Sequence, residues 1–139
     1  MLMLPLLALA AAWSHAQAQV LLKQRQGSIT TGHKTTASMD CIAEGIPDFQ
    51  YAYIHWYRQV PSKAPERILY IGPGAVSYDD NSYSNKYSSL KKSTNVCTFT
   101  ISDINSNDEG TYYCAYWHFH GTSRWQAACT ETCLCSEGQ

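Results

Sequence analysis

The side chains with the most distinctive chemistry in this sequence are six cysteines, which could form disulfides or bind a metal ion. The first three are spread through the chain, and the last three fall within a short C-terminal segment. In an exported protein a cysteine is first interpreted as half of a disulfide, because the secretory compartments are oxidising. The residues are Cys41, Cys97, Cys114, Cys129, Cys133 and Cys135.

The C-terminal segment also carries two histidines, so it offers both soft zinc ligands within a short span. Structural zinc sites use four Cys or His ligands at characteristic spacings. Here H-x-H is followed by C-x3-C-x-C, which matches no standard zinc finger. We therefore predict no metal site, and we expect these cysteines, if translated, to scramble or to pair between chains. The residues concerned are His118, His120, Cys129, Cys133 and Cys135.

No motif typical of catalysis is present. The sequence lacks G-x-S-x-G, H-E-x-x-H and any glycine-rich phosphate-binding loop. His33 and His55 have no acid or nucleophile at motif spacing, so both are interpreted as structural or surface residues. We predict a protein that is not an enzyme and has no cofactor. Its net charge of −1 gives no electrostatic reason to expect nucleic acid as a partner.

Residues 1–18 have the pattern of a secretory signal peptide. An apolar run from Leu2 to Trp13 precedes Ala16-Gln17-Ala18, the small-x-small pattern at which signal peptidase cleaves. The run is too short to cross a membrane core of about 30 Å and lacks flanking Lys or Arg. We expect cleavage after Ala18 and export, and no other run is long enough to serve as an anchor.

The segments after Gln19 are short and alternate between apolar and polar residues, which predicts strands. Gly and Pro between them leave no room for a long helix. An all-β sandwich or barrel is the expected architecture. The expected strands contain QVLLKQRQ, TTASMDCIA, AYIHWYRQ, ERILYIG and NVCTFTISD.

The sandwich is favoured over the barrel by the order of Cys41, Trp56 and Cys114. Their order is typical of a two-sheet sandwich in which a Trp packs on a disulfide that joins the sheets. In the chain-entropy model, closing a loop of this length stabilises by about 4 kcal/mol. These three residues are therefore predicted to form the centre of the core.

The heptapeptide DEGTYYC, residues 108–114, predicts a second feature of such a sandwich. Tyr112, two residues before the second Cys, is placed to return its hydroxyl to backbone groups near the preceding turn. Asp108 is placed to meet a cation at the start of another strand, and Lys86 is the expected partner.

D-x-G-x-Y-x-C together with Cys…Trp…Cys resembles an immunoglobulin variable-type (V-set) domain. The match covers about Gln19 to Trp117. Within that class, YIHWYRQVPSKAPERILYI and CAYW resemble the variable region of a T-cell receptor gamma chain. The resemblance implies a V-type β-sandwich of two antiparallel sheets at residues 19–117, and an antigen-recognising role at the T-cell surface in adaptive immunity.

The resemblance also implies how the domain pairs. Tyr57, Gln59, Ala64 and Pro65 would lie on the face that contacts a delta chain. The CD3 signalling complex would join through constant and membrane regions. Alternation alone shows only that Tyr57 and Gln59 point away from the side of Trp56, so both remain open to interpretation as ordinary solvent-facing residues.

Binding loops are expected at one end of the sandwich, roughly at 44–53, at 72–84 and after Cys114, with 88–95 as a flanking loop. Their aromatic and acidic side chains suit contact with a protein or lipid-presenting ligand. The same residue types are also ordinary loop formers. The contact residues we predict are Asp48, Phe49, Tyr51, Tyr53, Tyr78, Asp79, Asp80, Tyr83, Tyr116 and Trp117.

Residues 118–139 depart from the family pattern. A rearranged receptor would continue after Cys114 into Phe-Gly-x-Gly and a final strand, and this chain has neither. We therefore expect the last strand to be missing or incomplete, which leaves the strand ending at Cys114 with an unpaired edge. His120 and Thr130-Glu131-Thr132 can be back-translated as parts of a recombination signal, so an irregular tail read through from an unrearranged germline segment is the favoured interpretation. The alternative is a stand-alone secreted or cell-surface V-set domain in innate recognition.

Cys97 lies two residues before Phe99 and is therefore predicted to point inward. We interpret it as a buried thiol that acts as a small apolar side chain. Asn95-Val96-Cys97 is also the rare N-x-Cys form of a glycan acceptor. The predicted inward position of Cys97 argues against its use.

Overall fold

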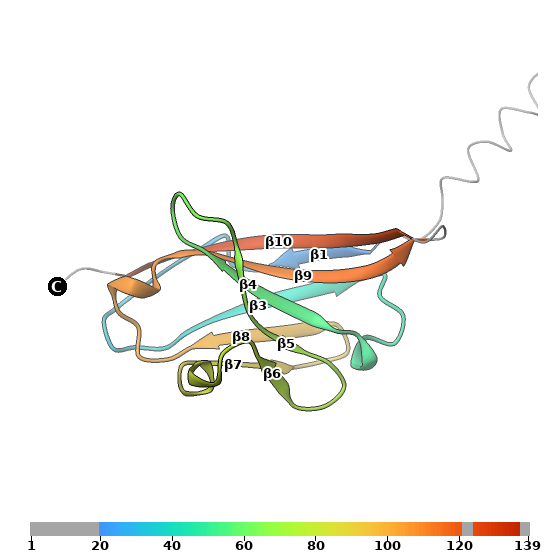
Figure 1. Cartoon of the computed structure of the whole chain (residues 1–139), viewed down its shortest axis with the longest axis horizontal. Helices are drawn as coiled ribbons and strands as arrows, with labels where there is room; N and C mark the ends of the chain where they lie inside the picture. The colour runs from blue at the N-terminus through green and yellow to red at the C-terminus, as the bar shows by residue number, and fades with distance from the viewer. Residues whose placement is uncertain (1–19, 121–123, 137–139) are drawn as a thin grey trace, which may run out of the picture.

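The computed structural model describes residues 20–120 and 124–136; at 118–120, 124–130 and 136 it describes the backbone only. The predicted signal peptide lies outside the described residues. In the described part, ten strands and three short 3-10 helices form two packed sheets (Figure 1). The predicted all-β V-type sandwich is confirmed. None of the described helices is long and apolar enough to cross a membrane.

One sheet has four antiparallel strands. Their apolar residues alternate, so that one face of each strand lies in the core while the other meets solvent. In spatial order the strands are β1 (Leu21–Gln24), β3 (Ala37–Glu44), β8 (Val96–Ile101) and β7 (Tyr87–Lys91).

The other sheet has six strands and covers the opposite side of the core. All its neighbouring strands are antiparallel except β2, which runs parallel to β10. In spatial order they are β2 (Ser28–Thr31), β10 (Arg124–Ser136), β9 (Gly110–His120), β4 (Ile54–Gln59), β5 (Glu66–Ile71) and β6 (Val76–Tyr78).

Strand β10 corrects the expectation that the last strand is missing. It pairs with β9 from Arg124–His120 to Leu134–Gly110 and also carries β2 on its other side. The physical reason is a short alternation, in which Thr132 and Leu134 are buried while the residues between and after them are exposed. The edge of β9 is therefore paired in the described residues.

A partly buried polar network connects β10 to the rest of the domain. The side-chain oxygen of Gln24 accepts a hydrogen bond from the Cys114 amide (3.1 Å), and its amide nitrogen donates to Thr132 Oγ1 (2.5 Å). The Thr132 hydroxyl in turn donates to the Gln26 carbonyl. Gln24 therefore links β1 to both β9 and β10.

The core is centred on the predicted disulfide. Cys41 and Cys114 are joined across the two sheets, which confirms that prediction, and Trp56 is fully buried. The indole stacks on Phe99 with ring centroids 4.9 Å apart, and Phe99 lies 5.9 Å from the ring of Tyr112. Aromatic packing thus joins residues from both sheets around the sulfur bridge.

Cys97 is a free, fully buried cysteine on β8, directly opposite Cys41 on β3. Its Sγ lies 3.4 Å from Ser89 Oγ. Burial raises the pKa of the thiol, which keeps it in the neutral form. Its place in the apolar core agrees with the interpretation of Cys97 as a small apolar side chain.

Candidate recognition and pairing surfaces

The loop between β3 and β4 contains the 3-10 helix η1 (Phe49–Tyr51) and lies at the right-hand end of the sandwich in Figure 1. Phe49 is buried in the core, so it anchors this loop rather than standing at its surface. Lys91 Nζ donates to the carbonyls of Gln50 (2.9 Å) and Ala52 (2.6 Å), and lies 5.4 Å from the Phe49 ring centroid. Lys91 on β7 therefore holds the backbone of the η1 loop in place.

Three of the predicted contact residues in this loop are exposed. Asp48 precedes η1 in the left-handed conformation (φ 52°), and Tyr51 and Tyr53 are 71% and 52% exposed. A Cβ at Gly72 would come within 2.6 Å of the Tyr53 ring, so the glycine makes room for that ring. Rigid, exposed tyrosines on a fixed loop are well suited to recognition.

The segment 72–84 begins at the same end but does not stay there. After β6 it reaches the 3-10 helix η2 (Asn81–Asn85), which lies at the opposite end in Figure 1. Tyr78 donates its hydroxyl to the Tyr87 carbonyl (2.7 Å), and Tyr83 packs edge-on against the Tyr87 ring at 5.5 Å. Both tyrosines therefore stabilise the packing against β7.

Two acidic residues of this segment also have local partners. Asp79 accepts hydrogen bonds from Arg67 Nε at 3.0 and 3.1 Å, and Asp80 caps η2 through the amide and hydroxyl of Ser82. Their side chains are partly occupied by these contacts.

The end of β9 contributes the last two predicted contact residues. Tyr116 is half-buried and packs on the core, whereas Trp117 is 45% exposed. Tyr116 pairs with Ile54, so continuing the register by one residue sets Trp117 opposite Tyr53. The loop end thus gathers exposed aromatic side chains from β9 and from the loop before β4. The β9–β10 tip, 121–123, lies outside the described residues.

The outer face of the six-stranded sheet carries the residues predicted for pairing. Tyr57 and Gln59 alternate with inward Trp56 on β4, and Tyr57 lies opposite Tyr113 on β9. The Tyr113 hydroxyl donates to the Gln59 side-chain oxygen (2.8 Å), and the Gln59 amide donates to the Lys63 carbonyl (2.9 Å). Ala64 and Pro65 are exposed in the β4–β5 turn.

A cluster around His55 adjoins this face and was not predicted. The His55 ring lies 5.5 Å from the Tyr70 ring, and its Nδ1 is 3.3 Å from Arg67 Nη1. Arg67 lies 4.8 Å from the Tyr70 centroid and pairs with Asp79. Burial, and then the Arg67 charge, lower the pKa of His55, although Asp79 acts in the opposite direction. The sequence indicated only that His55 is a structural or surface residue, and no sequence signal predicted its partners.

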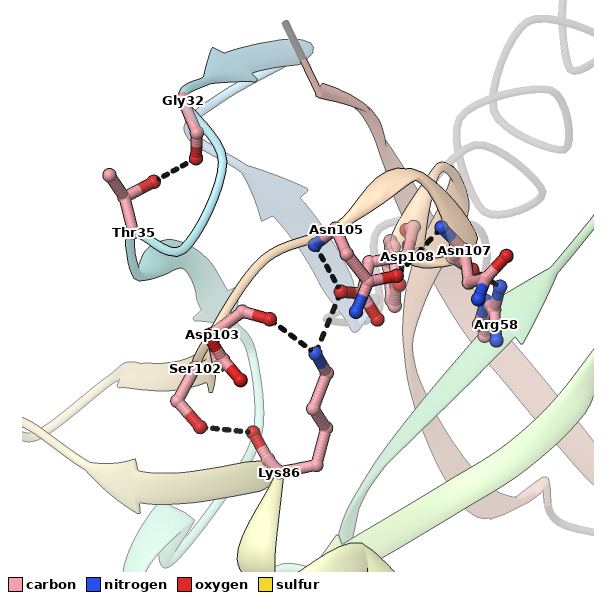
Figure 2. A network of polar contacts seen from close by, with 10 residues as sticks. Gly32, Thr35, Arg58, Lys86, Ser102, Asp103, Asn105, Asn107 and Asp108 are labelled. Carbon is pink, nitrogen blue, oxygen red and sulfur yellow. Dashed lines mark hydrogen bonds and ion pairs between the residues drawn. The ribbon is translucent and has the colours of Figure 1, made fainter. Parts of the chain in front are cut away.

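A polar corner holds the opposite end of the sandwich together. Lys86 Nζ lies 2.7 Å from Asp108 Oδ2, the pairing that the spacing predicts, and also donates to the Asp103 carbonyl (2.8 Å) (Figure 2). Asp108 also accepts from the Asn105 amide, closing the capping box of η3 (Ser106–Asp108). The Tyr112 hydroxyl donates to the Asp108 carbonyl (2.7 Å), as expected of a tyrosine corner.

The described side chains contain no group of His, Cys, Asp or Glu able to hold a metal ion. Of the tail residues considered as zinc ligands, Cys133 and Cys135 are exposed free thiols. The side chains of His118, His120 and Cys129 lie outside the described set.

The fold and these surfaces define an immunoglobulin-type domain, and a family model for the immunoglobulin V-set domain matches residues 24–130. The chain therefore belongs to the V-set family. Within it, the chain is similar to T-cell receptor gamma variable regions, as the resemblance implied. This family is non-enzymatic.

Two relatives illustrate the match. A T-cell receptor gamma chain V region of the mouse is 30% identical over 100 residues, which cover 69% of this chain and 71% of the relative. The human probable non-functional T cell receptor gamma variable 10 is 33% identical over 99 residues, which cover 69% and 82%.

Solved structures show the same fold at low identity. One, from work on T-cell specificity and activation by the superantigen toxic shock syndrome toxin-1, has a TM-score of 0.72, 17% identity, and coverage of 86% of this chain and 100% of that chain. Murine CRIg has a TM-score of 0.70, 14% identity, and coverage of 86% and 99%.

Proposed function

We propose that this domain is the ligand-recognising variable region of a T-cell receptor gamma chain, and that it pairs with a delta chain at the T-cell surface in adaptive immunity. The kinship with gamma variable regions supports the class of receptor. The observation that carries the proposal is the separation of two surfaces on one domain. Exposed aromatic residues lie at the loop end, and an uncharged row lies on the outer face of the six-stranded sheet.

The outer face has the composition of a pairing surface. Tyr57, Gln59 and Tyr113 lie together without a formal charge among them, and hydrogen bonds hold the polar groups of Tyr113 and Gln59 in place. Interface centres are rich in Tyr and poor in charged residues. A delta chain is the proposed occupant, and the CD3 complex would assemble through constant and membrane regions joined to this domain.

The loop end supplies the proposed ligand contacts. Tyr51, Tyr53 and Trp117 expose large, rigid side chains, and Asp48 adds negative charge beside them. The ligand class proposed is a protein or a lipid-presenting molecule. Export through residues 1–18 belongs to the same proposal.

Pairing is tested by mixing the secreted chain with delta variable domains and measuring the heterodimer by sedimentation. Tyr57→Glu should weaken pairing at least tenfold, because it buries an unpaired charge in the interface. Ser88→Glu, on the outer face of the other sheet, is the matched control and should pair as the wild type does. The pairing face is wrong if Tyr57→Glu pairs normally. The gamma-chain function is wrong if the wild type pairs with no delta domain.

A stand-alone V-set domain is the second candidate, and one observation favours it. Because β10 pairs with β9 and β2, the described domain already has the final strand that a joined segment would otherwise supply. A stable product ending at Gln139, detected by mass spectrometry, would support this candidate. A recombination signal after codon 119 and transcripts spliced near Trp117 would support the gamma segment, with residues 118–139 as germline read-through.

A further inference from the structure

The turn between β7 and β8 exposes an asparagine within an acceptor-like tripeptide. Asn95 is exposed, and its side-chain amide makes no hydrogen bond to another described residue. Its backbone carbonyl accepts from the Ala43 amide (2.8 Å), so the main chain is fixed while the side chain faces solvent. Val96 and Cys97 follow, which completes N-x-Cys with a middle residue other than proline.

The third residue of the tripeptide keeps the chemistry it needs. Cys97 has a free thiol, because the disulfide of the core joins Cys41 to Cys114. N-linked transfer acts on the chain before it folds, so the final burial of Cys97 does not block the reaction. Only the asparagine has to remain exposed afterwards, and Asn95 does. The inward position of Cys97 is therefore no argument against use of this acceptor.

We propose that Asn95 carries an N-linked glycan. Its side-chain nitrogen forms a bond to the anomeric carbon of an oligosaccharide carried on a polyprenyl diphosphate. The bond from that carbon to the diphosphate oxygen breaks, the diphosphate leaves with the electron pair, and a base of the transferase takes the amide proton. The inference rests on the export that the proposed function includes.

The position of Asn95 would let a glycan limit access to one side of the loop end. In the same turn, the Ser93 carbonyl accepts a hydrogen bond from the Gln50 side chain (3.4 Å), and Lys91 holds the carbonyls of Gln50 and Ala52. The turn is thus fastened to the η1 loop. A glycan there would screen this corner and direct a ligand toward the side of Tyr53 and Trp117.

The test expresses the full chain in mammalian cells behind a heterologous signal peptide, with an N-x-Thr reporter fused after Gln139 to report entry into the lumen. Peptide mass spectrometry with an N-glycosidase then measures occupancy at Asn95. The wild type should be modified, Asn95→Gln and Cys97→Ala should lose the glycan, and Cys97→Thr should carry more of it. Cys97→Ala and Cys97→Ser are matched in size, and only the serine variant should keep the glycan.

Two results would overturn the proposal. If Cys97→Thr is modified and the wild type is not, the cysteine acceptor is unused. If neither is modified while the reporter is, the turn is not a substrate. A parallel arm with the native residues 1–18 tests export separately: an unmodified reporter in that arm alone counts against the proposed function and leaves the glycan result standing.

Discussion

At the residue scale, the end of the sandwich opposite the η1 loop depends on a nearly buried carboxylate. Asp108 accepts hydrogen bonds from Lys86 and from the Asn105 amide, while its own carbonyl receives the Tyr112 hydroxyl. The Asp108 side chain is only 6% exposed and that of Lys86 is 24% exposed. A charge so far removed from water requires its partner.

Replacing that partner should therefore be costly. Lys86→Met should lower the free energy of unfolding by about 3 kcal/mol, because it leaves the Asp108 carboxylate buried without its cation. Urea denaturation of the purified domain measures the change. Lys92→Met is the control, since Lys92 is 57% exposed and lies 3.7 Å from Asp40, and it should cost about 0.5 kcal/mol or less. Equal losses in the two variants would contradict the role given to the corner.

His55 predicts a dependence of stability on pH. Burial and Arg67 hold its pKa in the folded domain below the ordinary 6.5, so the unfolded chain takes up a proton first as the pH falls. Stability contributed by neutral His55 is therefore fully present above that pH and is lost as the pH falls from 6.5 toward the folded-state pKa. NMR titration should give a midpoint below 6.5. The His55→Gln variant should lose less stability than the wild type between neutral and mildly acidic pH. An equal loss in the two proteins would show that another group causes the pH dependence.

At the element scale, β10 pairs with the edge of β9 and joins β2 to the six-stranded sheet. Leu134 is 1% exposed and Thr132 is fully buried, although this segment lacks the glycines of the usual family motif. The alternation of T-x-L near the chain end was the one sequence signal for this strand. It was overlooked because the Phe-Gly-x-Gly motif that usually marks the strand is absent. Gln24 could not be foreseen as its anchor, because its partners are 90 and 108 residues away in sequence.

If β10 packs as described, its apolar residue should contribute to global stability. Leu134→Ala should cost about 3 kcal/mol, by loss of buried apolar contact and the cavity left behind. Thermal and urea unfolding measure this. Cys135→Ala changes an exposed residue of the same strand and should leave stability almost unchanged. A silent Leu134→Ala would show that the segment does not pack in solution.

Other elements show where sequence reasoning succeeds. The Cys, Trp, Cys spacing and the heptapeptide before Cys114 predicted contacts that converge at the core and at the corner, since each type has a narrow structural role. Loop residues were less predictable. Phe49 lies inside and Tyr83 packs on Tyr87, because an aromatic ring in a loop can serve either the core or the surface.

At the scale of the whole molecule, one covalent bridge holds two sheets face to face. In this sandwich the loop end and the outer face of the six-stranded sheet are separate surfaces. The proposed ligand contacts and the proposed chain pairing therefore use different parts of one domain. Cys97 lies opposite Cys41 in the same core, yet burial raises the pKa of its thiol and so disfavours exchange with the bridge. The architecture therefore depends on which cysteines are joined.

Disulfide mapping of the folded domain tests this most directly. Free thiols are alkylated after unfolding without reduction, and the digest is read by mass spectrometry. We predict a peptide pair joined through Cys41 and Cys114, with Cys97 recovered alkylated. Recovery of Cys41 or Cys114 as a free thiol, or of either joined to another cysteine, would contradict the two-sheet architecture and the receptor function proposed from it.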